Sequence, residues 1–114
     1  MFDQESLYIL WTNADVWTAK HMVMMYATNA KKRGWWEEVT VIVWGATAKL
    51  VAEDEEIQRY VKEAQSVGVH FSACIACARN LDIIEELESL DIEIISWGPP
   101  LTELLKSGAK LLSV

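Results

Sequence analysis

The sequence predicts a single α/β domain over residues 1–114, with a mostly parallel sheet of about five strands. Short apolar runs alternate with longer segments of helical period, the pattern of strands joined by helical crossovers. With 52% hydrophobic residues, the chain can bury a substantial core. No Pro/Gly/Ser-rich linker or internal repeat divides it, so we expect one folding unit.

The first half contains two predicted strands and a long helix between them. Leu7–Trp11 is the first strand. Thr12, Asn13 and Asp15 follow it and are residue types that accept hydrogen bonds from the free N–H groups at the start of a helix. Apolar residues keep helical spacing to about Lys32, before a left-handed stop at Gly34. The run Val39–Trp44 is β-branched and uninterrupted rather than alternating, which is typical of a strand covered on both faces.

The second half continues the alternation. In order, we expect a short helix Ala46–Ala52, a helix from Asp54 to Gly68, a strand Val69–Ala73, helical stretches Ala76–Leu81 and Ile83–Leu90, a strand Ile92–Ser96, a helix from Pro99 to Gly108, and a short strand Lys110–Val114. Proline is tolerated in a first helical turn because the N–H it lacks would be unbonded there. The last strand is expected at an edge of the sheet or against a neighbouring subunit.

Loops that follow parallel strands gather at one edge of the sheet, where ligands usually bind. Three tryptophans lie at or near strand ends: Trp11, Trp44 and Trp97. They would form the aromatic walls of a small pocket whose floor is made of glycine residues. Alternatively, they are core or interface residues. Six tryptophans in so small a chain favour an oligomer. The predicted pocket residues are Asn13, Asp15, Gly45, Ala46, Arg79, Trp97 and Gly98.

Composition and charge exclude some classes of binding partner and indicate a cellular location. A net charge of −7 argues against nucleic acid or an anionic membrane as the main partner. The longest stretch without Asp, Glu, Lys or Arg, residues 64–78, is too short to span a membrane. The two cysteines lie only three positions apart, whereas the disulfide framework of a small secreted domain needs several bonds between distant segments. We therefore expect the protein to be located in the reducing cytosol.

The segment from His70 to Arg79 contains the residues best suited to chemistry. Cys74 is predicted where a strand passes into a helix, so free N–H groups and the helix dipole would stabilise its thiolate. A thiolate can attack a sulfur donor and hold the transferred atom as a persulfide. Cys77 lies one helical turn after Cys74, on roughly the same face of the predicted helix. Arg79 would add positive charge nearby.

Other interpretations of the cysteine pair remain open. Both cysteines could be small buried hydrophobic residues, or they could form a reversible redox dithiol. A zinc site is less favoured, because one such pair with only His21 and His70 elsewhere is no recognisable four-ligand pattern. No nucleotide-binding loop is present, so we expect neither a metal nor a cofactor.

The segment Gly68–Arg79 and the run Trp44–Leu50 resemble the DsrE/DsrF-like family, which includes the TusD-type sulfur-relay subunits. In this resemblance Cys74 falls at the persulfide-carrying cysteine of the family. The resemblance covers nearly the whole chain, from Leu7 to Val114. It implies a three-layer α/β/α sandwich, a cytoplasmic location and assembly into trimers or hexamers.

The leading hypothesis is therefore a sulfur-relay protein, a sulfurtransferase or sulfur carrier. Cys74 would accept sulfane sulfur from a donor protein and pass it to an acceptor protein, while Cys77 would resolve or tune the persulfide. The alternatives are a noncatalytic oligomeric module that binds a small ligand, with both cysteines packed, and a dithiol redox protein that uses Cys74 and Cys77.

Overall fold

A computed structural model describes residues 5–114. Residues 1–4, which belong to the predicted domain, lie outside the described part. The strands are β1 (Ser6–Trp11), β2 (Glu38–Val43), β3 (His70–Cys74), β4 (Glu93–Ile95) and β5 (Lys110–Ser113). They form one sheet in the order β4-β3-β2-β1-β5, and every neighbouring pair is parallel. The predicted α/β fold class is confirmed, and β5 is indeed an edge strand.

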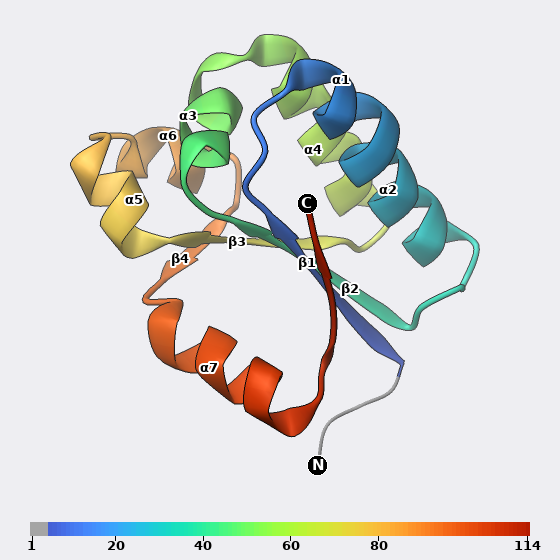
Figure 1. Cartoon of the computed structure of the whole chain (residues 1–114). Helices are drawn as coiled ribbons and strands as arrows, with labels where there is room; N and C mark the ends of the chain where they lie inside the picture. Colours follow the sequence, from blue (N-terminus) through green and yellow to red (C-terminus); the bar gives the residue numbers. More distant parts are fainter. Residues whose placement is uncertain (1–4) are drawn as a thin grey trace.

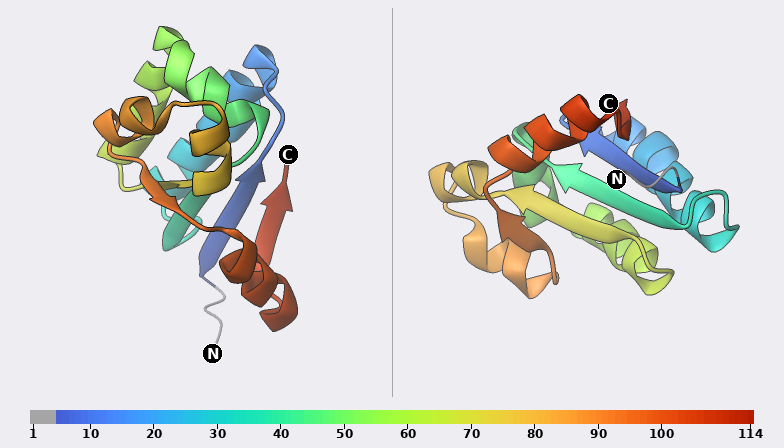
Figure 2. Two further views of the ribbon diagram at one scale, coloured as in Figure 1. Left: turned by 90° about the vertical axis from the view of Figure 1, so that its left-hand side faces the viewer. Right: turned by 90° about the horizontal axis from the view of Figure 1, so that it is seen from below.

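Helices lie on both faces of the sheet (Figure 1). The helical segments are α1 (Val16–Thr18), the π-helix η1 (Ala19–Met24), α2 (Met25–Lys32), α3 (Ala46–Glu53), α4 (Glu55–Ser66), α5 (Ile75–Asn80), α6 (Ile84–Ser89) and α7 (Gly98–Ser107). The crossovers from β1 to β4 each move one strand along the sheet in the same direction, so α1 to α6 share one face. The connection from β4 back to β5 runs the other way, which leaves α7 on the opposite face (Figure 2). The result is a three-layer α/β/α arrangement.

The long helix predicted after β1 is interrupted by the π-helix η1. Asp15 caps it as expected, because its carboxylate accepts the backbone N–H of Thr18 at 2.9 Å. The wider π turns keep Ala19, Val23 and Met24 buried against the sheet. The predicted end at Lys32 is correct.

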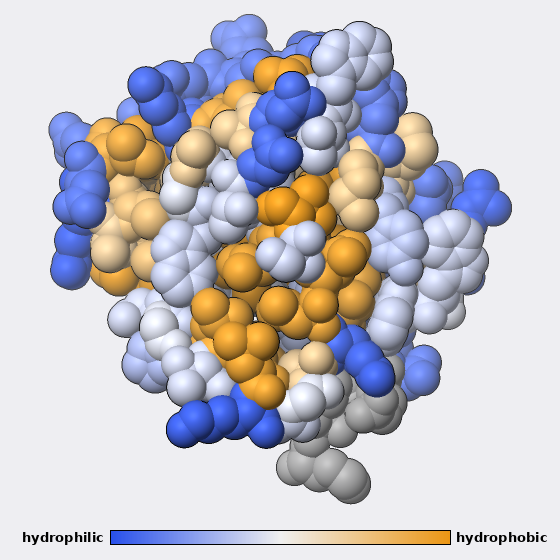
Figure 3. Space-filling model, in the orientation of Figure 1, coloured by the Kyte–Doolittle hydropathy of each residue, from blue (hydrophilic) through white to orange (hydrophobic). Residues whose placement is uncertain are grey.

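The two faces of the sheet are covered unequally. The face under α1–α6 carries the main core, in which Ile9, Trp11 and Phe71 are almost completely buried. On the other face a small buried cluster of Ile42, Cys74 and Trp97 lies beneath α7. Because α7 itself contains no buried residue, this second face is only partly covered. Figure 3 shows apolar side chains gathered on the surface over β5 and α7.

Candidate functional site at the end of the third strand

The two cysteines lie where β3 passes into α5, at the carboxyl edge of the sheet. Cys74 is the last residue of β3 and the N-cap of α5, with an extended backbone (φ −76°, ψ 124°). Cys77 follows in the first turn of α5. Both thiols are free. The predicted junction at Cys74 is confirmed. Strand β3 ends at Cys74, one residue after the predicted strand end at Ala73.

The chemistry predicted for Cys74 requires an accessible thiol, but Cys74 is buried. Its side chain is only 5% exposed and is packed with Ile42 and Trp97. It also makes no capping hydrogen bond with the N–H groups of α5, a helix of six residues. The reason is strand alternation: Cys74 shares the face of Ser72, which points toward α7 rather than toward the loops at the sheet edge.

Cys77 is the more accessible of the two sulfurs. It is half-buried, and its Sγ accepts the backbone N–H of Gly45 at 3.3 Å. Beside it lies an open, mainly apolar hollow of about 380 Å³ between α3 and α5. This hollow is lined by Gly45, Ala46, Lys49, Cys77, Asn80 and Leu81.

The turn after β2 aims the Gly45 N–H at Cys77. Gly45 has φ 72° and ψ −134°, a conformation essentially restricted to glycine. The buried hydroxyl of Thr47 fixes the same turn: it donates to the carbonyl of Trp11 at 2.7 Å and accepts the N–H of Trp44 at 3.2 Å. One side chain thus joins the ends of β1 and β2 directly behind the hollow.

The structure brings together only part of the predicted pocket. Gly45 and Ala46 line the hollow beside Cys77. Asn13, Asp15, Arg79 and Gly98 do not line it, and all four are exposed. Asn13 and Asp15 instead organise the start of α1, where Asn13 Oδ1 accepts the Asp15 N–H at 2.9 Å.

The three tryptophans predicted as pocket walls lie apart from this hollow. Trp11 is fully buried in the main core, Trp44 is half-buried, and Trp97 is buried on the α7 face. The core interpretation therefore holds for Trp11 and Trp97. The exposed tryptophans are Trp17 and Trp35, at 72% and 54%.

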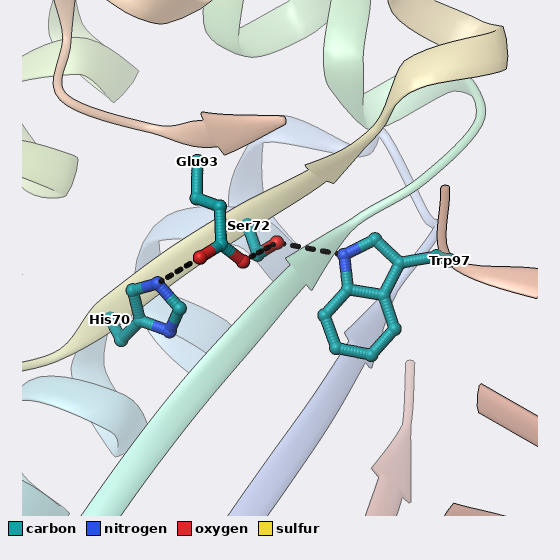
Figure 4. Close-up of polar contacts among 4 residues, drawn as sticks. All are labelled: His70, Ser72, Glu93 and Trp97. Carbon is teal, nitrogen blue, oxygen red and sulfur yellow. Dashed lines mark hydrogen bonds and ion pairs between the residues drawn. The ribbon is translucent and has the colours of Figure 1, made fainter. Parts of the chain in front are cut away.

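A second polar group, which sequence reasoning missed, lies on the α7 face (Figure 4). The indole Nε1–H of Trp97 donates to Ser72 Oγ at 2.8 Å, and Ser72 Oγ donates to Glu93 Oε1 at 2.8 Å. Glu93 Oε2 lies 3.7 Å from His70 Nε2. Alternation along β3 places His70 and Ser72 on one face, but the pairing of Ser72 with Glu93 depends on strand register, which the sequence does not encode locally.

Lys49, Asn80 and Leu81 were also missed as lining residues of the hollow. Helical spacing could have indicated them. Lys49 follows Gly45 and Ala46 by four and three positions, and Asn80 and Leu81 follow Cys77 by three and four.

Within residues 5–114, no group of three or more His, Cys, Asp or Glu side chains is arranged to hold a metal ion. No helix in the same range is long and apolar enough to cross a membrane.

Fold and site together define an all-parallel α/β protein with two free cysteines at the carboxyl edge of its third strand. The chain is similar to the conserved protein of unknown function BT1422 from Bacteroides thetaiotaomicron. Identity is 41% over 96% of this chain and 95% of that one, with a TM-score of 0.95. It therefore belongs to the same family as BT1422.

A more distant structural neighbour shares the fold. The protein of unknown function MTH1491 from Methanobacterium thermoautotrophicum has a TM-score of 0.63 and 16% identity, over 98% of this chain and 100% of that one. No protein-family model and no curated protein matches the sequence.

Proposed function

We propose that this protein is a sulfur carrier that holds sulfane sulfur as a persulfide on the Cys74–Cys77 pair and passes it to a partner protein. The observation that supports this most directly is the environment of Cys77: a free thiol beside an open hollow, with the Gly45 N–H donating to its Sγ. The thiolate of an accessible cysteine is the form that attacks a sulfur donor.

The loading step conserves atoms and electrons. The Cys77 thiolate attacks the terminal sulfur of a persulfide donor, the S–S bond of the donor breaks, and the donor leaves as a thiolate. In a second exchange the Cys74 thiolate attacks the same terminal sulfur, and Cys77 leaves as a thiolate. Each exchange forms one S–S bond and breaks one, so no outside oxidant or reductant is needed.

The two thiols suit different parts of this sequence. Cys77 is half-buried beside the hollow, where a donor has access. Cys74 is enclosed by Ile42 and Trp97, where a persulfide would be shielded from water and small oxidants. Cys77 itself packs against that cluster, so the sulfur atom need not cross solvent between the two thiols. The predicted persulfide on Cys74 is thus kept, with Cys77 as the thiol that receives it first.

The proposal includes partners and location. Donor and acceptor proteins would dock on a homo-oligomer, a trimer or hexamer, in the cytoplasm. Support for self-association comes from exposed apolar side chains, among them Trp17 and Trp35.

A second candidate is favoured by one observation. The near-complete burial of Cys74 is also what a packing cysteine shows, so the chain would then be a noncatalytic module that binds a small ligand. The third possibility, a redox dithiol, requires a reversible bond between Cys74 and Cys77.

Intact-mass spectrometry separates these functions. The wild type and the variants Cys74→Ser, Cys77→Ser and Cys74→Ser/Cys77→Ser are each incubated with inorganic polysulfide. We expect the wild type to gain one sulfur atom, Cys74→Ser to load but lose the atom quickly, and Cys77→Ser to load slowly. The double variant is the blank.

Three outcomes would reject or change the assignment. If the wild type gains no sulfur, the carrier function is rejected. Loading of Cys77→Ser at the wild-type rate would move the first step to Cys74. A loss of two hydrogens in the wild type, without a gain of sulfur, would support the redox dithiol.

A further inference from the structure

The indole of Trp97 covers the Cys74 sulfur on the α7 face. Trp97 is the N-cap of α7, in the connection that leaves β4, and it is 5% exposed. With Ile42 it forms the buried cluster that contains Cys74. The indole is therefore part of the packing that shields Cys74 on this face.

A chain of two hydrogen bonds holds the indole in place (Figure 4). Ser72 has one hydroxyl proton, which it donates to Glu93 Oε1, so a lone pair remains to accept the Trp97 Nε1–H. Ser72 is fully buried and lies two residues before Cys74 on the same strand face. The contact that fixes the tryptophan is thus built on the same strand as the sulfur that it covers.

Space for movement of the indole exists next to it. An open hollow of about 640 Å³ lies between α7 and the sheet, lined in part by Tyr8, Trp97, Pro100 and Leu104. No residue within α7 is fully buried, although Leu101 and Leu104 pack against the cluster of Ile42, Cys74 and Trp97. Trp97 is therefore held by its hydrogen bond to Ser72 and by its packing in the cluster that contains Cys74.

We infer that Trp97 is a gate for Cys74, closed when its indole donates to Ser72 and open when the indole moves into the hollow beneath α7. The two sulfurs then have separate routes: Cys77 through the hollow between α3 and α5, and Cys74 past Trp97 on the α7 face. The significance for sulfur transfer rests on the proposed function, whereas the gate itself is a property of the fold. Trp97, Ser72 and Glu93 act as positioning residues.

The test measures alkylation of Cys74 by iodoacetamide in a Cys77→Ser background, where Cys74 is the remaining thiol. Trp97→Phe and Ser72→Ala each remove the hydrogen bond, and we expect each to raise the Cys74 alkylation rate on the order of tenfold. Glu93→Leu removes the acceptor that orients Ser72 and should also raise the rate. Glu93→Gln keeps an acceptor oxygen for Ser72, so the alkylation rate of Cys74 should stay at the value measured with Glu93 in place.

The matched control places the same substitutions in a Cys74→Ser background and follows Cys77. Its rate should change less than that of Cys74, because Trp97, Ser72 and Glu93 do not line the hollow beside Cys77, although Cys77 packs against the cluster that contains Trp97. Unchanged Cys74 rates in Trp97→Phe and Ser72→Ala would overturn the gate, as would an equal rise at both cysteines, which indicates general loosening. Alkylation needs no sulfur donor, so a failed gate and a failed sulfur carrier are separate results.

Discussion

The backbone N–H of Gly45 and the sulfur of Cys77, 32 residues apart in the sequence, are joined by a hydrogen bond of 3.3 Å. It connects the turn after β2 to the first turn of α5. A glycine-only backbone conformation at residue 45 makes this contact possible. The environment of the accessible thiol therefore depends on a turn in a different crossover of the fold.

Gly45→Ala should slow alkylation of Cys77. Forcing a Cβ into this conformation costs about 1–3 kcal/mol of folding free energy, and relaxation of the turn would draw the N–H away from the sulfur. A hydrogen bond is worth about 0.5–1.5 kcal/mol, so the Cys77 rate should fall by about 2- to 12-fold. The measurement is iodoacetamide kinetics in the Cys74→Ser background, together with chemical denaturation.

Gly108→Ala is the matched control, since Gly108 also has a positive φ, 76°, but ends α7 far along the chain from the cysteines. It should destabilise the fold and leave the Cys77 rate unchanged. Equal effects of both alanine variants on Cys77 would mean that the Gly45 contact has no influence on its reactivity.

Thr47→Val should destabilise the protein by about 1–3 kcal/mol, because it removes a buried hydroxyl and leaves the Trp11 carbonyl without this donor. Valine has nearly the same shape, so the loss reports hydrogen bonding rather than packing. Urea denaturation gives the free energy of unfolding, and Thr47→Ser, which keeps the hydroxyl, should retain most of the stability. A Val variant as stable as the wild type would show that the hydroxyl is dispensable.

Asp15 should make the start of α1 sensitive to acid. The backbone N–H of Thr18, followed by its hydroxyl, lowers the pKa of Asp15 below its ordinary value of 3.8. Because the folded pKa is lower than the unfolded one, the stabilisation is complete above the unfolded value and is lost as the pH falls through the folded one. Thermal melts of wild type and Asp15→Asn should differ by a constant small amount near neutral pH.

This difference should shrink as the pH falls from 3.8, the ordinary pKa, through the lower pKa of the folded state, where the folded aspartate becomes protonated. Asp15→Ala lacks a capping oxygen and should melt below Asp15→Asn at every pH. If the gap between wild type and the Asn variant is unchanged in acid, the carboxylate charge contributes nothing to the cap.

Self-association should depend on the outer face of the first helical segment. Trp17, stacked on His21 with ring centroids 4.7 Å apart, is 72% exposed and would be covered in an oligomer. We expect sedimentation of the wild type at three or six times the 12.9 kDa chain mass, in line with the proposed trimer or hexamer. Trp17→Glu should shift it toward monomer, whereas Trp17→Phe should assemble. A monomeric wild type would contradict the proposed assembly.

The amino-acid sequence by itself determined the order of the elements and their approximate bounds, but not the π-helix η1 within the first helix. The apolar run before Trp44, the cap at Asp15 and the stop before Gly34 are local signals, because each depends on periodicity or on hydrogen bonds between near neighbours. For the same reason the junction of β3 and α5 at Cys74 could be predicted from the chain alone. Alternation of strands and helices was enough to predict the parallel sheet.

Only the tertiary structure decided how the site is built. Whether Cys74 faces the loops or α7, and which residue covers it, depends on the single backward crossover that places α7 on the second face of the sheet. The contact of Gly45 with Cys77 and that of Ser72 with Glu93 join segments 32 and 21 residues apart. Such contacts follow from strand order and register, which are set by the packing of the whole core and leave no mark on local sequence spacing.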